Sequence, residues 1–147
     1  MENVIIHKTD SGVAVTTPAS EFLKTHTIND CVSRVVPTGV PFKIVDKSQI
    51  LSDHTFRNAW EYNDGSIVVN LDKAKAIWKD KWREVRHSLL ASLDIEFMKA
   101  VESGDSVKQA EIAAKKQALR DVTNTEISGN SPEEIKSVWP EVLGEKQ

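Results

Sequence analysis

Four histidines and one cysteine are the residues of this sequence best suited to acid–base or nucleophilic chemistry. His7, His26, His54 and His87 could act as general bases, and Cys31 is the single thiol nucleophile. No two histidines stand at a helical ligand spacing, and His26 with Cys31 lacks the second pair of ligands that zinc requires. We therefore interpret all five as surface or turn residues, and we expect no metal site.

Short motifs that carry catalytic chemistry are absent from the sequence. The nucleophile motifs Ser-x-x-Lys and Gly-x-Ser-x-Gly do not occur, and neither does the dinucleotide-binding Gly-x-Gly-x-x-Gly nor the phosphate-binding Gly-x-x-x-x-Gly-Lys loop. We therefore expect a protein that is not an enzyme, with no catalytic residue and no cofactor.

The most basic stretch, residues 72–87, holds six lysines and arginines against three acidic residues, with Trp78 and Trp82 among them. Basic residues interleaved with aromatic ones can bind a nucleic-acid strand, because the rings stack on bases. However, both tryptophans share one helical stripe with Val85 and Leu89, which favours a core or a protein interface. Nucleic-acid binding through residues 73–87 stays the alternative function.

Polar and aromatic residues are also dense at 53–60. We predict that Asp53 makes an Asx turn, that Arg57 pairs locally with an acid, and that Phe56 and Trp60 close the core of the surrounding unit. An exposed partner-binding loop is the alternative for this segment.

Residues 1–70 must form the elements that position this segment, and their pattern is that of strands and turns. Gly12 predicts a hairpin turn, Asp64 with Gly65 predicts a second one, and Thr27 with Asp30 predicts a helix start. The expected elements are strands at 4–7, 13–17, 42–46, 55–62 and 66–70 and a helix at 27–36. For 55–60 a helix capped by Asp53 is an alternative to the strand.

Beyond residue 70 the apolar period changes to steps of three and four, which is typical of amphipathic helices. Apolar residues recur from Leu71 to Val101 and predict one long helix over 71–103, ended by Gly104. A second helix is expected at 106–122, with a stripe formed by Val107, Ala110, Ala114 and Ala118 beside Ile112 and Leu119. A third is expected at 132–143, with Ser131 as N-cap, Pro132 at N1 and Glu134 closing a capping box.

Composition bounds the class of protein. The chain has 147 residues, a net charge of −3 and one cysteine, so it holds no intrachain disulfide and has no strongly basic field for nucleic acid. Its longest apolar stretches are too short to span a bilayer, and the first residues lack the pattern of a secretory signal. We predict an α+β fold with a β-rich domain at 1–70, which includes a short helix, and an α-helical domain at 71–147.

The sequence resembles a group of small proteins encoded in phage and prophage tail regions. The run Asp53-His54-Thr55-Phe56-Arg57-Asn58-Ala59-Trp60 is similar to their Asp-Arg-Thr-Phe-Arg-x-Ala-Trp pattern, which a long charged helix follows. The later segments are similar to the helical module of phage tail assembly chaperones. The matching residues are 52–61, 69–77, 82–94, 117–121 and 132–140.

This resemblance implies a non-enzymatic bacteriophage protein that binds tail-fibre or baseplate proteins as an assembly factor, a structural part of the virion tail, or both. It would act in the host cytoplasm during assembly or remain in the virion tail. The long helix could also join copies of the chain into a homo-oligomer, and neither membrane nor nucleic acid is an expected partner. Aromatic and arginine side chains are favoured interface anchors, so the predicted partner-binding residues are Trp78, Trp82, Phe97, Trp139, Arg57 and Trp60.

Overall fold

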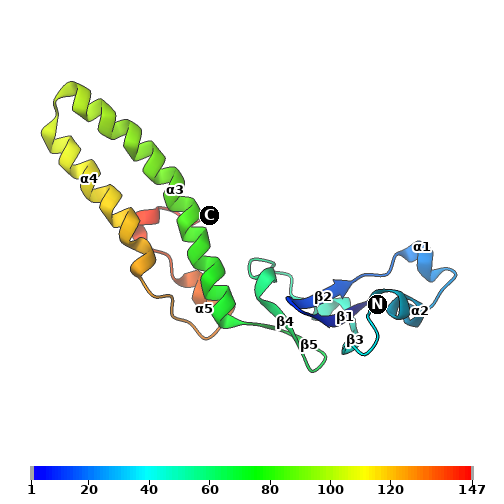
Figure 1. Cartoon of the computed structure of the whole chain (residues 1–147). Helices are drawn as coiled ribbons and strands as arrows, with labels where there is room; N and C mark the ends of the chain where they lie inside the picture. Colours follow the sequence, from blue (N-terminus) through cyan, green and yellow to red (C-terminus); the bar gives the residue numbers. More distant parts are fainter. Residues whose placement is uncertain (1, 147) are drawn as a thin grey trace. The chain divides into compact units, whose positions relative to one another are not determined.

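The chain divides into two compact units, Met1–Lys73 and Ala74–Gln147, which we call the β unit and the helical unit (Figure 1). A computed structural model describes residues 2–146. The division falls in the first turn of the long helix α3 (Leu71–Ser103), close to the boundary expected at residue 70. An antiparallel sheet is followed by long helices, so the predicted α+β class is confirmed.

A three-stranded antiparallel sheet in the order β2–β1–β3 forms the base of the β unit. The central strand β1 (Asn3–Thr9) pairs with β2 (Gly12–Thr16) and β3 (Phe42–Asp46). Because side chains alternate along a strand, Val4 and Ile6 face one side and Ile5 and His7 the other. All four are buried, so both faces of β1 are covered.

The hairpin of β4 (Trp60–Asn63) and β5 (Ser66–Val69) completes this core. Trp60 is buried with Val4, Ile6, Val13 and Val45. The turn between β4 and β5 has positive φ at Asp64 and Gly65 (48° and 81°), as the sequence predicted.

The strand predicted over 55–62 is wrong in its first half. The Asp53 carboxylate accepts hydrogen bonds from the Thr55 N–H (3.0 Å) and hydroxyl (2.6 Å), which confirms the predicted Asx turn. The chain then makes one 3-10 turn, η2 (Arg57–Ala59), so extended backbone begins only at Trp60. A side-chain bond that turns the backbone at Asp53 competes with the strand ladder and prevails here.

Two short helices connect β2 to β3. The sequence did not predict α1 (Ser20–Leu23), whereas α2 (Ile28–Val35) lies within the predicted helix. Thr27 and Asp30 form the complete capping box at its start: the Asp30 carboxylate accepts from the Thr27 N–H (2.8 Å), and the Thr27 hydroxyl oxygen accepts from the Asp30 N–H (3.2 Å). The remaining 3-10 turns are η1 (Lys47–Gln49), η3 (Val122–Asn124) and η4 (Glu141–Leu143).

This capping box predicts a pH dependence of stability. The hydrogen bond from the Thr27 N–H holds the pKa of Asp30 below its ordinary value of 3.8. A carboxylate with a lowered folded-state pKa stabilises the fold above the unfolded value, and this contribution is lost as pH falls through the folded pKa. We expect Asp30→Asn to lower the free energy of unfolding of the β unit at pH 7. In strong acid, the variant and the unmodified chain should have nearly the same free energy of unfolding. Urea unfolding at several pH values measures the gap, and an NMR titration midpoint for Asp30 above 3.8 would contradict its cause.

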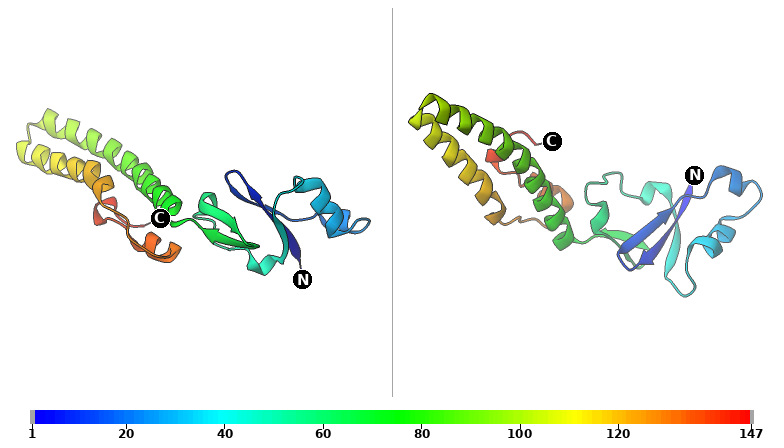
Figure 2. Two further views of the ribbon diagram at one scale, coloured as in Figure 1. Left: turned by 60° about the horizontal axis from the view of Figure 1, so that its bottom comes forward. Right: turned by 45° about the horizontal axis from the view of Figure 1, so that its top comes forward.

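The helical unit is built on α3 and α4 (Ser106–Asp121), which lie side by side as an antiparallel pair (Figure 2). Helix α3 has the predicted bounds. Gly104, at φ 71°, follows its end, and the Asp105 carboxylate caps α4 by accepting from the Lys108 N–H (3.0 Å).

The stripe predicted to be the core face of α4 is wrong. Val107, Ala110, Ala114 and Ala118 are all exposed, whereas Ile112 and Leu119 are buried. Burial stabilises roughly in proportion to apolar area, so the face with the larger aliphatic side chains turns inward and the alanines remain outside.

The helix predicted over 132–143 is shorter than expected, because α5 (Pro132–Ser137) ends before Pro140. Pro140 has no N–H to donate, and it disfavours helical backbone at the residue before it. Ser131 caps α5 as predicted, by accepting from the Glu134 N–H (3.2 Å). The Glu134 carboxylate, however, accepts from the Asn130 N–H (2.6 Å) rather than from that of Ser131.

Candidate functional site

Three of the predicted partner-binding residues are buried by the chain itself: Trp60 in the β unit, and Trp78 and Trp82 in the helical unit. Trp78 donates its indole N–H to the Val138 carbonyl (2.8 Å), and its ring lies 5.6 Å from that of Trp139. Trp82 has an exposed fraction of 0%. Both are core residues rather than partner contacts, because folding of their own chain has already covered these rings.

Trp139 and Phe97 are half-buried and keep part of their surface accessible. The indole N–H of Trp139 donates to the Gly144 carbonyl (2.8 Å), which ties down the last residues of the described chain. The Lys116 ammonium lies 5.5 Å from the ring centroid of Phe97 and also pairs with Asp94. A partner role for these two residues stays a prediction.

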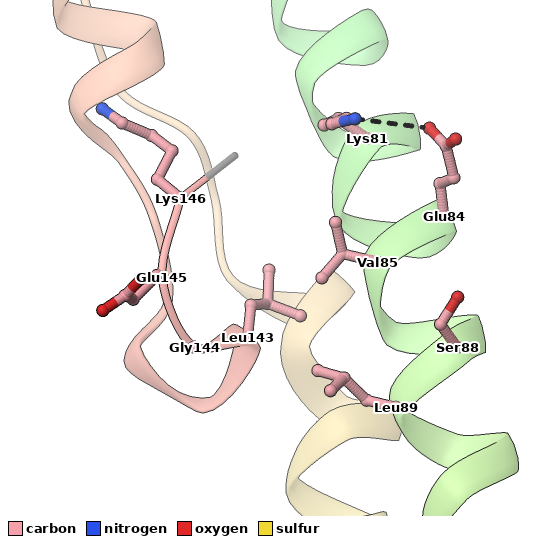
Figure 3. Close-up of a pocket in the computed structure, with 9 residues that line it drawn as sticks. All are labelled: Lys81, Glu84, Val85, Ser88, Leu89, Leu143, Gly144, Glu145 and Lys146. Carbon is pink, nitrogen blue, oxygen red and sulfur yellow. Dashed lines mark ion pairs between the residues drawn. The ribbon is translucent and has the colours of Figure 1, made fainter.

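A pocket of about 420 Å³ lies between α3 and the C-terminal segment (Figure 3). Val85 and Leu89 of α3 face Leu143 across it, while the Lys81–Glu84 ion pair (3.7 Å) lies at its rim. The Lys146 ammonium is engaged by the Lys136 carbonyl (3.2 Å). The walls therefore combine three aliphatic side chains with charged and polar ones, and they do not point to one kind of ligand. The lining residues are Lys81, Glu84, Val85, Ser88, Leu89, Leu143, Gly144, Glu145 and Lys146.

The basic segment 73–87 does not present a nucleic-acid surface of the predicted kind. Its two tryptophan rings are buried and cannot stack on bases. Lys81 and Arg83 pair with Glu84 and Asp80 on the same helix. The Arg86 guanidinium donates to the Arg120 carbonyl (3.0 Å) and to the Thr123 hydroxyl (3.3 Å), which joins α3 to the end of α4.

Four aliphatic residues in the last turns of α3 and the first turn of α4 are the most exposed large apolar side chains of residues 2–146. Their exposed fractions are 60% for Ile95, 58% for Met98, 46% for Val101 and 69% for Val107. We call them the hairpin-end residues. Sequence reasoning assigned Val101 and Val107 to buried stripes and did not single out Ile95 or Met98. The available signal was that Ile95 and Met98 fall outside the core stripe of α3.

In the β unit, Arg57 and Trp60 lie together at a smaller pocket of about 220 Å³, lined by Ser11, Val13, Arg57, Asn58 and Trp60. The guanidinium carbon of Arg57 is 4.8 Å from the Trp60 ring centroid, and the Arg57 Nη2 atom donates to the Val13 carbonyl (3.2 Å). Within residues 2–146 no carboxylate oxygen pairs with Arg57. The predicted local ion pair of Arg57 is therefore wrong, because the ring and the carbonyl hold the guanidinium instead.

The histidines and the cysteine do not all lie at the surface as predicted. His7 and Cys31 are buried, because β1 is covered on both faces and Cys31 lies on the inner side of α2. His26 stacks on Phe22 (4.4 Å between centroids), and His54 meets the Trp60 ring edge-on (5.3 Å). Among the described residues no three His, Cys, Asp or Glu side chains are placed to share a metal ion.

Comparison with protein-family models, curated proteins and solved structures gives no match for this chain. Within residues 2–146, no helix combines the length and the apolar character that crossing a membrane requires.

Proposed function

We propose that this chain is a phage tail-associated protein that binds a tail-fibre or baseplate protein through the end of its helical hairpin and catalyses no reaction. It would act in the host cytoplasm during tail assembly, and in the virion tail where it is retained. The resemblance of residues 53–60 and of the helical segments to phage tail-region proteins supports the choice of partner. The hairpin-end residues support the choice of surface.

The exposure of the hairpin-end residues carries this proposal. Large apolar side chains that folding leaves exposed near one end of a helix pair are candidate anchors for an interaction. Burial of a Val, Ile or Met side chain contributes about 1.5–3 kcal/mol, so four of them could supply much of the affinity of a helix-mediated contact. They flank the α3–α4 turn, which lies at the end of the hairpin away from α5 (Figure 1).

Substitution of two hairpin-end residues tests the surface. We expect Met98→Glu combined with Val107→Glu to reduce co-purification with the tail-fibre or baseplate protein of the same phage by at least about tenfold, because a buried unpaired carboxylate opposes the contact. Both residues are exposed in the free chain, so circular dichroism and the melting temperature should stay close to those of the unmodified chain.

The matched control is Leu23→Glu combined with Val142→Glu, which adds the same charge at exposed apolar residues that are not among the hairpin-end residues. Equal binding by both double variants would contradict the assignment of the surface.

Mass spectrometry of purified particles separates an assembly factor, which is absent from them, from a structural part of the tail. A sedimentation measurement shows whether the same substitutions dissolve a homo-oligomer instead.

No observation favours the nucleic-acid alternative now that both rings of segment 73–87 are known to be buried. It predicts binding that weakens steeply as salt rises, because phosphate contacts release counterions, whereas an apolar helix contact does not weaken in this way.

A further inference from the structure

We propose that the pocket beside Arg57 binds a carboxylate, presented by an acidic side chain or by the C-terminus of a polypeptide. This site lies in the β unit and does not depend on the hairpin-end residues or on the proposed function. The argument rests on the orientation of Arg57, on the polar groups around the pocket and on its size.

Arg57 is held in one orientation while most of its hydrogen-bonding capacity stays available. Its guanidinium lies over the buried ring of Trp60 and donates to the Val13 carbonyl. An arginine has five N–H donors, and within residues 2–146 the Val13 carbonyl is the one acceptor that this side chain contacts. The half-buried guanidinium has no negative charge paired with it. A carboxylate would supply that charge and accept two parallel hydrogen bonds from the guanidinium.

The remaining walls suit a carboxylate. Ser11 and Asn58, which also line the pocket, carry a hydroxyl and an amide that can donate, and the Ser11 hydroxyl already lies 3.4 Å from that of Thr9. Val13 and Trp60 supply apolar surface for the methylene groups behind an acid. At about 220 Å³ the pocket is below the roughly 300–1,000 Å³ of sites for drug-sized ligands. It is suited to a single side chain or chain end rather than to a nucleotide.

The two sides of the pocket are fixed to each other before a ligand arrives. Gly12, at φ 149°, brings the β1–β2 turn so close to the Trp60 carbonyl that a Cβ at this position would overlap it. This contact sets Ser11 and Val13 against Arg57, Asn58 and Trp60. A preformed pocket binds more tightly because less conformational entropy is lost on binding.

NMR titration of the full-length chain tests the proposal, with the Arg57 Nε–H and the Ser11 and Asn58 amides as reporters. The probes are N-acetyl-glutamate α-amide, which carries a side-chain carboxylate, N-acetyl-alanine, which carries a terminal one, the neutral N-acetyl-glutamine α-amide, and inorganic phosphate. We expect saturable millimolar binding of at least one carboxylate, at least tenfold weaker binding of phosphate and no binding of the neutral amide. The two carboxylate probes distinguish a side chain from a chain end.

Variants assign the binding to Arg57. Arg57→Gln should abolish it and Arg57→Lys should weaken it at least about fivefold, since an ammonium cannot form the planar bidentate pair. Arg34→Gln is the matched control, because Arg34 also lies over an aromatic ring, that of Phe22 (4.9 Å), and should leave binding unchanged. Failure of both carboxylates to shift the reporters in the unmodified chain, or equal binding of phosphate, would overturn the proposal whether or not the variants fold.

Discussion

Trp82→Ala is expected to lower the free energy of unfolding of the helical unit by about 3–5 kcal/mol, the range for removal of a large aromatic side chain from a packed core. The indole is fully buried, so truncation leaves a cavity that the rigid α3–α4 pair can fill only in part. Urea unfolding followed by circular dichroism at the helical minimum measures the change, because most helical residues belong to this unit.

Two further variants make this expectation specific. The indole N–H of Trp82 has no hydrogen-bond partner among the described residues, and a buried donor without a partner is costly. Trp82→Phe removes that donor and leaves a smaller cavity, so it should cost clearly less than Trp82→Ala. Ile95→Ala, at an exposed position of the same helix, should stay within about 0.5 kcal/mol of the unmodified chain. If Trp82→Ala were no more damaging than Ile95→Ala, the assignment of Trp82 to the core would be wrong.

Gly12→Ala is expected to destabilise the β unit by about 3 kcal/mol or more. Backbone with φ 149° is a region that residues with a Cβ rarely adopt, at a cost of about 1–3 kcal/mol. The added methyl group would also overlap the Trp60 carbonyl oxygen. Because that oxygen belongs to the backbone, the β1–β2 turn must move away from β4 to relieve the overlap.

Gly39→Ala is the control for Gly12→Ala. Gly39 also has positive φ (80°), but nothing lies within 4 Å of the position where its Cβ would be. Gly39→Ala should therefore lower the free energy of unfolding only by the cost of positive φ at an alanine, about 1 kcal/mol. Denaturant unfolding followed through the NMR signals of Val4 and Ile6 reports on the β unit alone. Equal losses from the two alanine variants would show that the close approach of Gly12 to Trp60 has no energetic weight.

These substitutions also separate the two proposed sites. Gly12→Ala should weaken carboxylate binding at Arg57, since it displaces one wall of that pocket, while Trp82→Ala acts on the helical unit alone. The paired substitutions at Met98 and Val107 should leave the Arg57 pocket unaffected. Each proposal can therefore fail without the other.

Where the sequence predicted well, the cause of the structure is local. The bounds of α3, the capping box of Thr27 and Asp30, the Asx turn at Asp53 and the Asp64–Gly65 turn all depend on bonds or backbone preferences within about four residues. Such interactions have the same geometry in any tertiary context, so residue types and spacing are enough to predict them.

The wrong predictions concern side chains whose contacts come from residues far away in the sequence. Both faces of α4 carry apolar residues, and periodicity alone ranked the alanine face first. The area that Ile112 and Leu119 bury decides otherwise. Arg57 was expected to find an acid nearby in sequence, yet its hydrogen bond goes to Val13, 44 residues away.

The sequence by itself determined the α+β class, the change of period near residue 70 and most helix caps and turns, because these follow from short-range chemistry. Only the tertiary structure decided which apolar residues are core and which stay exposed. It covers Trp78 and Trp82 and exposes Ile95, Met98 and Val107. The physical reason is that burial depends on which distant segments pack against a helix face. The apolar pattern of one helix does not specify those segments.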